Sequence, residues 1–189
     1  MRRPPATESA RLQAVGWVDE RQAAQETILG LYDEHQRELF SFLLSLTRNS
    51  ASAEDLLQEA FMRLIREVRS GRTPQAPRAW LFRVCTNLVV SESRHRRSAE
   101  RWQARIAPAT ATASAEHEFI TREDERLLSD ALGDLATDAR AGLLMSAHGF
   151  GGEEIAQLLG RSHLATRSLL FRARAKLRDR LRPGRADDD

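Results

Sequence analysis

The sequence lacks the features that mark secreted and membrane-spanning proteins. Cys85 is the single cysteine among 189 residues, so no disulfide can form within the chain, and a reducing intracellular setting fits best. No stretch approaches the roughly 20 apolar residues that a bilayer requires. The N-terminal segment carries Arg2 and Arg3 but no apolar core of signal-peptide length. We therefore expect a soluble cytoplasmic protein without membrane insertion.

The residues that build catalytic centres are also sparse or badly placed. The segment Gly149–Gly152 lacks the Lys-Ser/Thr pair of a phosphate-binding loop and follows no predicted strand. Cys85 lies on an apolar helical stripe, where a small core residue is the better interpretation. The five histidines show no metal-ligand spacing: His35, His95, His117, His148 and His163. We expect no enzymatic activity, no metal and no cofactor.

Helical spacing dominates what is present, and we find no strand pattern. The sequence predicts an all-α fold of two small helical domains, a three-helix bundle and a helix-turn-helix unit, joined by a flexible linker. The linker prediction comes from the segment IAPATATASAEHE, which is rich in Ala, Thr and Ser. The expected parts are a flexible N-terminal extension (1–22), the first domain (23–98), the linker (99–122), the second domain (123–182) and an acidic tail (183–189).

The segment SASAEDLLQEAFMRLIREV, residues 50–68, predicts an amphipathic helix with one broad apolar stripe. Ser52 and Asp55 have the spacing of a capping box. The opposite face is polar apart from one methionine, and its residues are Glu54, Asp55, Gln58, Glu59, Met62 and Arg63. Such a face is usually solvated surface, so a docking role for it needs a separate argument.

The segment EEIAQLLGRSHLATRSLLFRARAKLRDRL, residues 153–181, has the layout of a helix-turn-helix. Gly160 is a predicted C-cap of the short first helix, and Ser162 is a predicted N-cap of the second. The second helix has a predicted buried stripe at Thr166, Leu170, Ala173 and Leu177, and it is rich in arginine elsewhere. Such a helix can lie in the major groove of DNA. The alternative is a solvated basic helix in an ordinary bundle.

A second basic stretch, SRHRRSAERWQAR at 93–105, extends a predicted helix that begins near Pro77. Arg83 and Asn87 lie on the polar side of that helix. Asparagine can read an adenine edge, and arginines can hold phosphates. A charge run alone is usually only surface. Two basic helices joined by a linker nevertheless indicate two contact points on one nucleic acid.

Three motifs together resemble the bacterial sigma-70 family of transcription initiation factors, in its short extracytoplasmic-function group. They are AEDLLQEAFMRL (53–64), AWLFRVCTNLVVSESRHRR (79–97) and EEIAQLLGRSHLATRSLLFRARAKL (153–177). The resemblance implies that 28–98 match the second conserved region of the family and 125–182 the fourth. It also implies three partners: core RNA polymerase (the clamp helices of its largest catalytic subunit and its flap region), promoter DNA and an anti-sigma protein.

The resemblance also implies roles for individual residues. The polymerase-binding set would be Asp55, Gln58, Glu59 and Met62. The set facing the minus-ten promoter element would be Arg83, Asn87, Ser91, Arg94, Arg96 and Arg97. The recognition-helix set facing the minus-thirty-five element would be His163, Arg167, Ser168, Phe171, Arg172 and Arg174.

The recognition helix departs from the family pattern. Ala165 and Thr166 stand where the family commonly has Thr-Val, and Leu169 stands where Arg is usual. Leu164 replaces a small residue, so exposed apolar side chains could meet thymine methyl groups or pack on a partner. Two alternatives to a sigma factor therefore stay open: a helix-turn-helix regulator that acts without polymerase, and a sigma-like decoy that titrates an anti-sigma protein.

Overall fold

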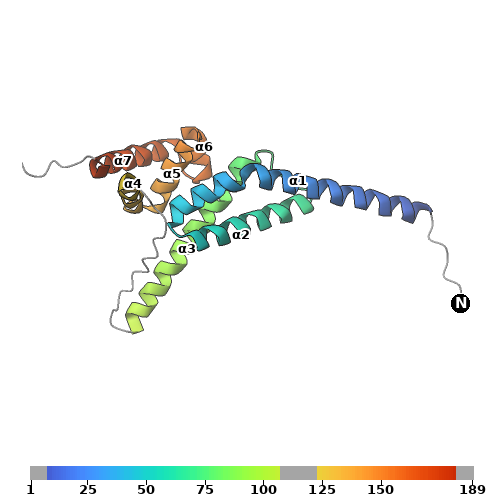
Figure 1. Cartoon of the computed structure of the whole chain (residues 1–189), viewed down its shortest axis with the longest axis horizontal. Coiled ribbons are helices and arrows are strands. Elements are labelled where there is room, and N and C mark those ends of the chain that lie inside the picture. The colour runs from blue at the N-terminus through green and yellow to red at the C-terminus, as the bar shows by residue number, and fades with distance from the viewer. Residues whose placement is uncertain (1–7, 107–122, 182–189) are drawn as a thin grey trace, which may run out of the picture.

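The computed structural model describes residues 8–106 and 123–181, with side chains for 22–95 and 126–181. Within these ranges it contains helices and no strand, which confirms the all-α prediction. Figure 1 shows α1, α2 and α3 side by side, with the four shorter helices grouped against one end of this bundle. The helices are α1 (Glu8–Thr47), α2 (Ser50–Arg69), α3 (Pro77–Ile106), α4 (Glu123–Gly133), α5 (Thr137–Ala147), α6 (Gly152–Leu158) and α7 (His163–Leu181).

The apolar stripes of α1, α2 and α3 meet in a common core. The rings of Phe42 and Phe82 lie 4.7 Å apart between centroids, and Leu64 of α2 is fully buried beside them in the same cluster. Cys85 is also fully buried, and burial raises the pKa of its thiol to about 12. The thiol therefore stays protonated at neutral pH, which confirms the interpretation of Cys85 as a core residue.

Helices α4 to α7 form the second half, in which α7 packs on the other three helices. Thr166, Leu170 and Ala173 of α7 are buried, as the sequence predicts, whereas Leu177 of the same predicted stripe is only half-buried. The close approach of α5 to α7 depends on Gly142, because a Cβ atom there would lie 2.9 Å from Leu170 Cδ2. Any larger residue at Gly142 would therefore displace the Leu170 side chain.

Several predicted boundaries differ from the structure. Helix α1 begins at Glu8, so residues 8–22 are helical instead of forming an irregular extension. Helix α3 continues to Ile106, which confirms the predicted helical extension through 93–105, so the first part of the predicted linker, 99–106, is helical. The rest of that linker, 107–122, lies outside the described residues. Both predicted domain boundaries, at 22 and at 98, thus fall inside a helix.

The N-cap of α2 is also different from the prediction. Helix α1 ends before Arg48, whose φ of 59° turns the chain, and α2 starts at once behind Asn49. The Asn49 side-chain oxygen accepts a hydrogen bond from the Ser52 backbone N–H at 2.8 Å. Asn49 is therefore the cap and Ser52 lies in the first turn of the helix, so the predicted capping box at Ser52 is wrong.

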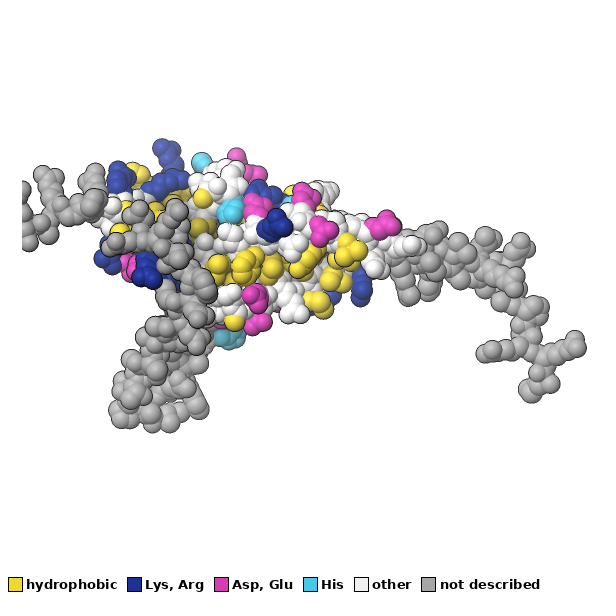
Figure 2. Space-filling view, viewed as in Figure 1, with side chains coloured by type: hydrophobic (Ala, Val, Ile, Leu, Met, Phe, Trp, Pro, Cys, Tyr) yellow, Lys and Arg dark blue, Asp and Glu magenta, His cyan; other side chains and the backbone are white. Residues whose placement is uncertain are grey.

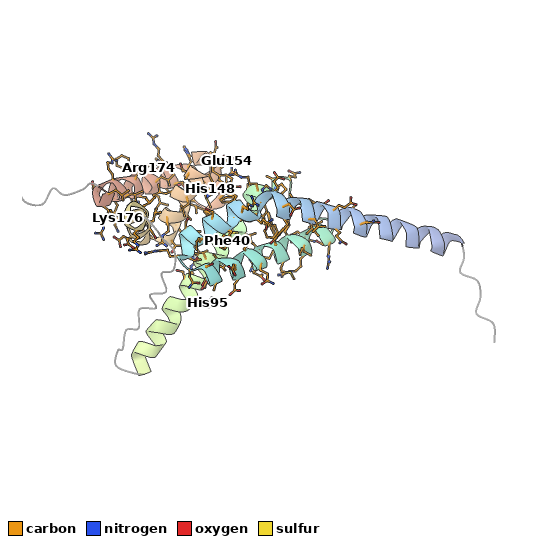
Figure 3. All side chains as sticks on the ribbon, viewed as in Figure 1. Phe40, His95, His148, Glu154, Arg174 and Lys176 are labelled. Atoms are coloured by element: carbon orange, nitrogen blue, oxygen red, sulfur yellow. The ribbon has the colours of Figure 1, made fainter. Side chains whose placement is uncertain are left out.

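The two halves of the chain, α1–α3 and α4–α7, pack against each other. Helices α1 and α3 contact α5, and α3 also contacts α6. One continuous hydrophobic cluster contains Phe42 and Phe82 from the first half and Met145, Phe150 and Ile155 from the second. Figure 3 shows His148 where the C-terminal end of α5 meets α1. The two predicted domains therefore share a core in this structure.

A polar cluster closes the junction between the halves. The Arg78 guanidinium of α3 donates to both carboxylate oxygens of Glu38 on α1, with Nε 2.9 Å from Oε2. Arg78 Nη2 also donates to the His148 carbonyl at 2.6 Å, and the guanidinium lies 4.4 Å from the Phe150 ring centroid. His148 Nδ1 lies 3.2 Å from Glu38 Oε1. We call these three residues, Glu38, Arg78 and His148, the junction cluster.

Acid is expected to loosen this junction. The hydrogen bond from Arg78 holds the pKa of the Glu38 carboxyl below its ordinary value, with a smaller contribution from His148 and an opposing one from burial. A carboxylate with a lowered folded-state pKa stabilises the fold above its unfolded pKa, about 4.3, and this stabilisation is lost as the pH falls through the folded-state value. The radius of gyration, measured by X-ray scattering between pH 7 and pH ~3, should therefore increase at the acid end.

Other carboxylates also titrate in this range, so the comparison is with Glu38→Gln. That variant should already be looser at neutral pH and should lose part of the acid response. Identical pH profiles for the two proteins would contradict a role for the Glu38 charge. Glu154 is the other charged group whose field acts on Arg78, and it stays in place in both proteins.

A second contact between the halves is built on Arg140 of α5. Its Nη1 donates to the Leu46 carbonyl of α1 at 2.7 Å, and its Nη2 donates to the Gly133 carbonyl at the end of α4 at 2.8 Å. The last carbonyls of a helix have no partner within the helix and carry partial negative charge. Arg140 therefore caps two helices at once and ties α1 to α4.

Among the described helices, none combines the length and the apolar composition that a membrane crossing needs.

Candidate functional site

The outward face of α2 is available for a partner. Asp55, Gln58 and Met62 are exposed, and the exposed fraction of Met62 is 46%. Glu59 lies on the same face and accepts hydrogen bonds from Arg63 at 2.9 Å and from Arg66 at 3.2 Å. The Arg63 hydrogen bond contributes most to lowering the pKa of Glu59, so this residue is negative at neutral pH. The four predicted polymerase-binding residues therefore form one face, which we call the α2 face.

Exposed apolar side chains lie on α1, which packs against α2. Figure 2 shows a band of hydrophobic side chains across the α1–α2 part of the molecule. On α1 the exposed large hydrophobic residues are Leu29, Tyr32 and Leu44. The Tyr32 side chain is 40% exposed, although its ring contacts the Phe61 ring of α2 at 4.8 Å between centroids. An exposed apolar group beside a charged helix face is typical of a protein interface.

The exposed side of α3 carries four of the six residues predicted to face the minus-ten element. Arg83, Asn87, Ser91 and Arg94 are all exposed and recur at helical spacing. The opposite side of the helix is the buried stripe that contains Phe82 and Cys85. Arg96 and Arg97 lie on the same helix, but their side chains are outside the described residues. The described part of α3 therefore presents a polar and basic strip to solvent.

The helix-turn-helix of α6 and α7 has well-formed local geometry. Gly160 has a φ of 63°, and the Arg161 N–H donates to the Ala156 carbonyl at 2.9 Å, which closes the end of α6. The Ser162 hydroxyl accepts a hydrogen bond from the Ala165 N–H at 3.3 Å, so Ser162 caps α7 as predicted. These caps fix the angle at which α7 leaves the turn.

The six residues predicted to face the minus-thirty-five element are all exposed: His163, Arg167, Ser168, Phe171, Arg172 and Arg174. Lys and Arg side chains gather over α7 in Figure 2. His163, Arg167 and Arg174 also border a shallow cavity of about 250 Å³ between α7 and the α5–α6 pair. A helix-turn-helix whose second helix is basic on its exposed side is the arrangement of a DNA-binding transcription protein.

Comparison with known proteins shows which DNA-binding transcription proteins this chain is similar to. A family model described as Sigma-70 region 2 matches residues 31–99. The ECF RNA polymerase sigma factor SigL of Mycobacterium tuberculosis is 34% identical, over 78% of this chain and 90% of SigL. The RNA polymerase sigma factor CarQ of Myxococcus xanthus is 35% identical, over 85% of this chain and 92% of CarQ.

Two solved structures share the fold. The sigma factor RpoE from Bartonella quintana, solved in complex with the anti-sigma factor NepR, is 28% identical with a TM-score of 0.61 and covers 87% of this chain and 99% of RpoE. CnrH, solved with the cytosolic domain of CnrY, is 26% identical with a TM-score of 0.57, over 85% of this chain and 92% of CnrH. The chain belongs to the extracytoplasmic-function group of RNA polymerase sigma factors. Its function is that of a sigma factor, which directs RNA polymerase to promoters.

Proposed function

We propose that the α2 face and the neighbouring apolar residues of α1 form the surface that binds core RNA polymerase. The observation that carries this proposal is the α2 face itself, where acidic, amide and thioether side chains stand exposed on a helix whose other side is buried. Apolar anchors surrounded by charged groups suit a specific and reversible partner. The counterpart on the polymerase would be the clamp helices of the largest catalytic subunit, with the flap region contacting the second half.

Two DNA contacts follow from the two basic helices. The exposed side of α3 would face the minus-ten element, where Arg83 and Arg94 hold phosphates and Asn87 reaches a base edge. Helix α7 would face the minus-thirty-five element. Contacts to melted DNA would offset part of the cost of unstacking, a few kcal/mol per base. The chain would act in the cytoplasm with polymerase and would carry out no catalytic step of its own.

We also propose an anti-sigma partner, because a similar sigma factor was solved in complex with an anti-sigma factor. RpoE was solved with the anti-sigma factor NepR, and CnrH was solved with the cytosolic domain of CnrY. For the present chain the partner would cover one or both of the surfaces described above.

Co-migration with core polymerase on size exclusion tests the docking surface, and transcription by the same complex tests the DNA contacts. We expect the purified chain to co-migrate and the complex to initiate at specific promoters. A folded chain that binds specific duplex DNA tightly without polymerase would instead be a free helix-turn-helix regulator. A chain that binds an anti-sigma protein but supports no transcription would be a decoy.

A further inference from the structure

Helix α7 presents two large apolar side chains to solvent on its outward face. Leu164 is 74% exposed and Phe171 is 69% exposed, and both fractions are larger than that of any other large hydrophobic residue in the described part of the chain. They are seven residues apart, two turns of helix, so they lie on the same side. The opposite side of α7 packs against the other helices through its buried residues Thr166, Leu170 and Ala173. The exposed pair therefore contributes nothing to the core.

The surroundings of this pair are cationic. Arg167, Arg172 and Arg178 are exposed on α7, and no acidic residue precedes Asp179 in this helix. Phosphates line both rims of the major groove, and the thymine methyl group is the apolar feature of its floor. An apolar pair flanked by arginines is complementary in charge and polarity to that groove. This complementarity favours duplex DNA over a protein helix, for which so many unpaired cations would be costly to bury.

We propose that Leu164 and Phe171 determine upstream sequence specificity by contacting thymine methyl groups in the major groove. The proposal rests on the proposed function, in which α7 enters that groove at the minus-thirty-five element. Seven residues at 1.5 Å each separate the two side chains by about 10 Å along the helix, which is about three base pairs at 3.4 Å per step. The preferred upstream element should therefore contain two thymines about three base pairs apart.

The test removes the methyl groups alone. Polymerase carrying the full chain selects bound duplexes from a pool randomised over the upstream segment, and the winning duplex is resynthesised with deoxyuridine at each thymine in turn. Deoxyuridine pairs like thymine but lacks the 5-methyl group. Burial of one methyl-sized group corresponds to about a fourfold change in affinity. We expect about a fourfold loss at each of two positions and little change elsewhere.

Protein variants then assign each methyl group to its reader. Leu164→Ala should become insensitive to deoxyuridine at one position, and Phe171→Ala at the other. Leu181→Ala is the matched control, because Leu181 is also exposed but lies at the C-terminal end of α7. The Leu181→Ala variant should still lose affinity at both deoxyuridine positions.

The outcomes separate this proposal from the proposed function. Suppose that the polymerase complex binds promoters but binds each deoxyuridine duplex as tightly as the duplex with thymine. The methyl contacts are then absent, and this proposal is overturned while the proposed function stands. If both alanine variants keep the full sensitivity, the assignment of the two residues is overturned. If the chain gives no promoter-bound polymerase complex, the proposed function fails and this proposal fails with it.

Discussion

Asp55→Arg should weaken the binding of core RNA polymerase by at least about tenfold, the size expected when a complementary charge at an interface is reversed. Asp55 is exposed at the N-terminal end of the α2 face, and its side chain takes no part in the core. An arginine there meets the same polymerase surface with the opposite charge. The apolar stripe and the Asn49 cap of α2 are unchanged, so the helix content should stay the same.

The measurement is a binding titration of labelled chain with core polymerase, together with circular dichroism of each variant. Asp179→Arg serves as the control, because it reverses the charge of an exposed aspartate on α7, outside both the α2 face and the apolar residues of α1. It should bind nearly as well as the unmodified chain. Equal binding by Asp55→Arg and the unmodified chain would remove the α2 face from the docking surface.

Arg140→Ala should lower the free energy of unfolding by about 3 kcal/mol, because hydrogen bonds to a charged group are lost and carbonyls at two helix ends lose their donor. The carbonyls concerned are those of Leu46 at the end of α1 and Gly133 at the end of α4, with a longer contact to Leu135. For a chain of this size the melting temperature should fall by roughly 10 °C.

Urea denaturation and thermal melting measure this effect directly. Arg140→Lys should recover only part of the loss, because a single ammonium group cannot reach both helix ends with the geometry of a planar guanidinium. Arg66→Ala is the control for removing a surface arginine, since Arg66 is exposed and pairs with Glu59 on its own helix. A loss for Arg140→Ala no larger than that for Arg66→Ala would contradict the double-capping role.

Much of this architecture follows from local sequence rules. The apolar stripes of α1, α2, α3 and α7 predict the buried faces, and Gly160 with Ser162 predicts the turn of the helix-turn-helix. The exposed residues of α2, α3 and α7 follow from the same periodicity, because a residue off the stripe of an amphipathic helix faces outward. Functional roles for these residues came from the family resemblance, and they stay proposals.

Features that depend on long-range packing were not predictable in this way. Leu127 and Leu128 fit the helical stripe of α4, yet both are exposed because only one side of this short helix meets α7. Glu38, Arg78 and His148 are far apart in sequence, and no periodicity indicates that they meet. Thr166 is fully buried, and its hydroxyl has no hydrogen-bond partner. Valine, common at this position in the family, would avoid that unsatisfied group.

The shared core of the two halves has a thermodynamic consequence for promoter recognition. Packed helices lie about 8–10 Å apart, whereas elements separated by about 25 base pairs are about 85 Å apart along DNA. If α3 and α7 contact these two elements as proposed, they cannot reach both at once while α5 and α6 stay packed on α3. A chain that contacts both must separate its halves, and its apparent affinity is then the intrinsic affinity multiplied by the population of the open state. Every residue that strengthens the junction cluster would thus lower the fraction of the chain that can contact both promoter elements.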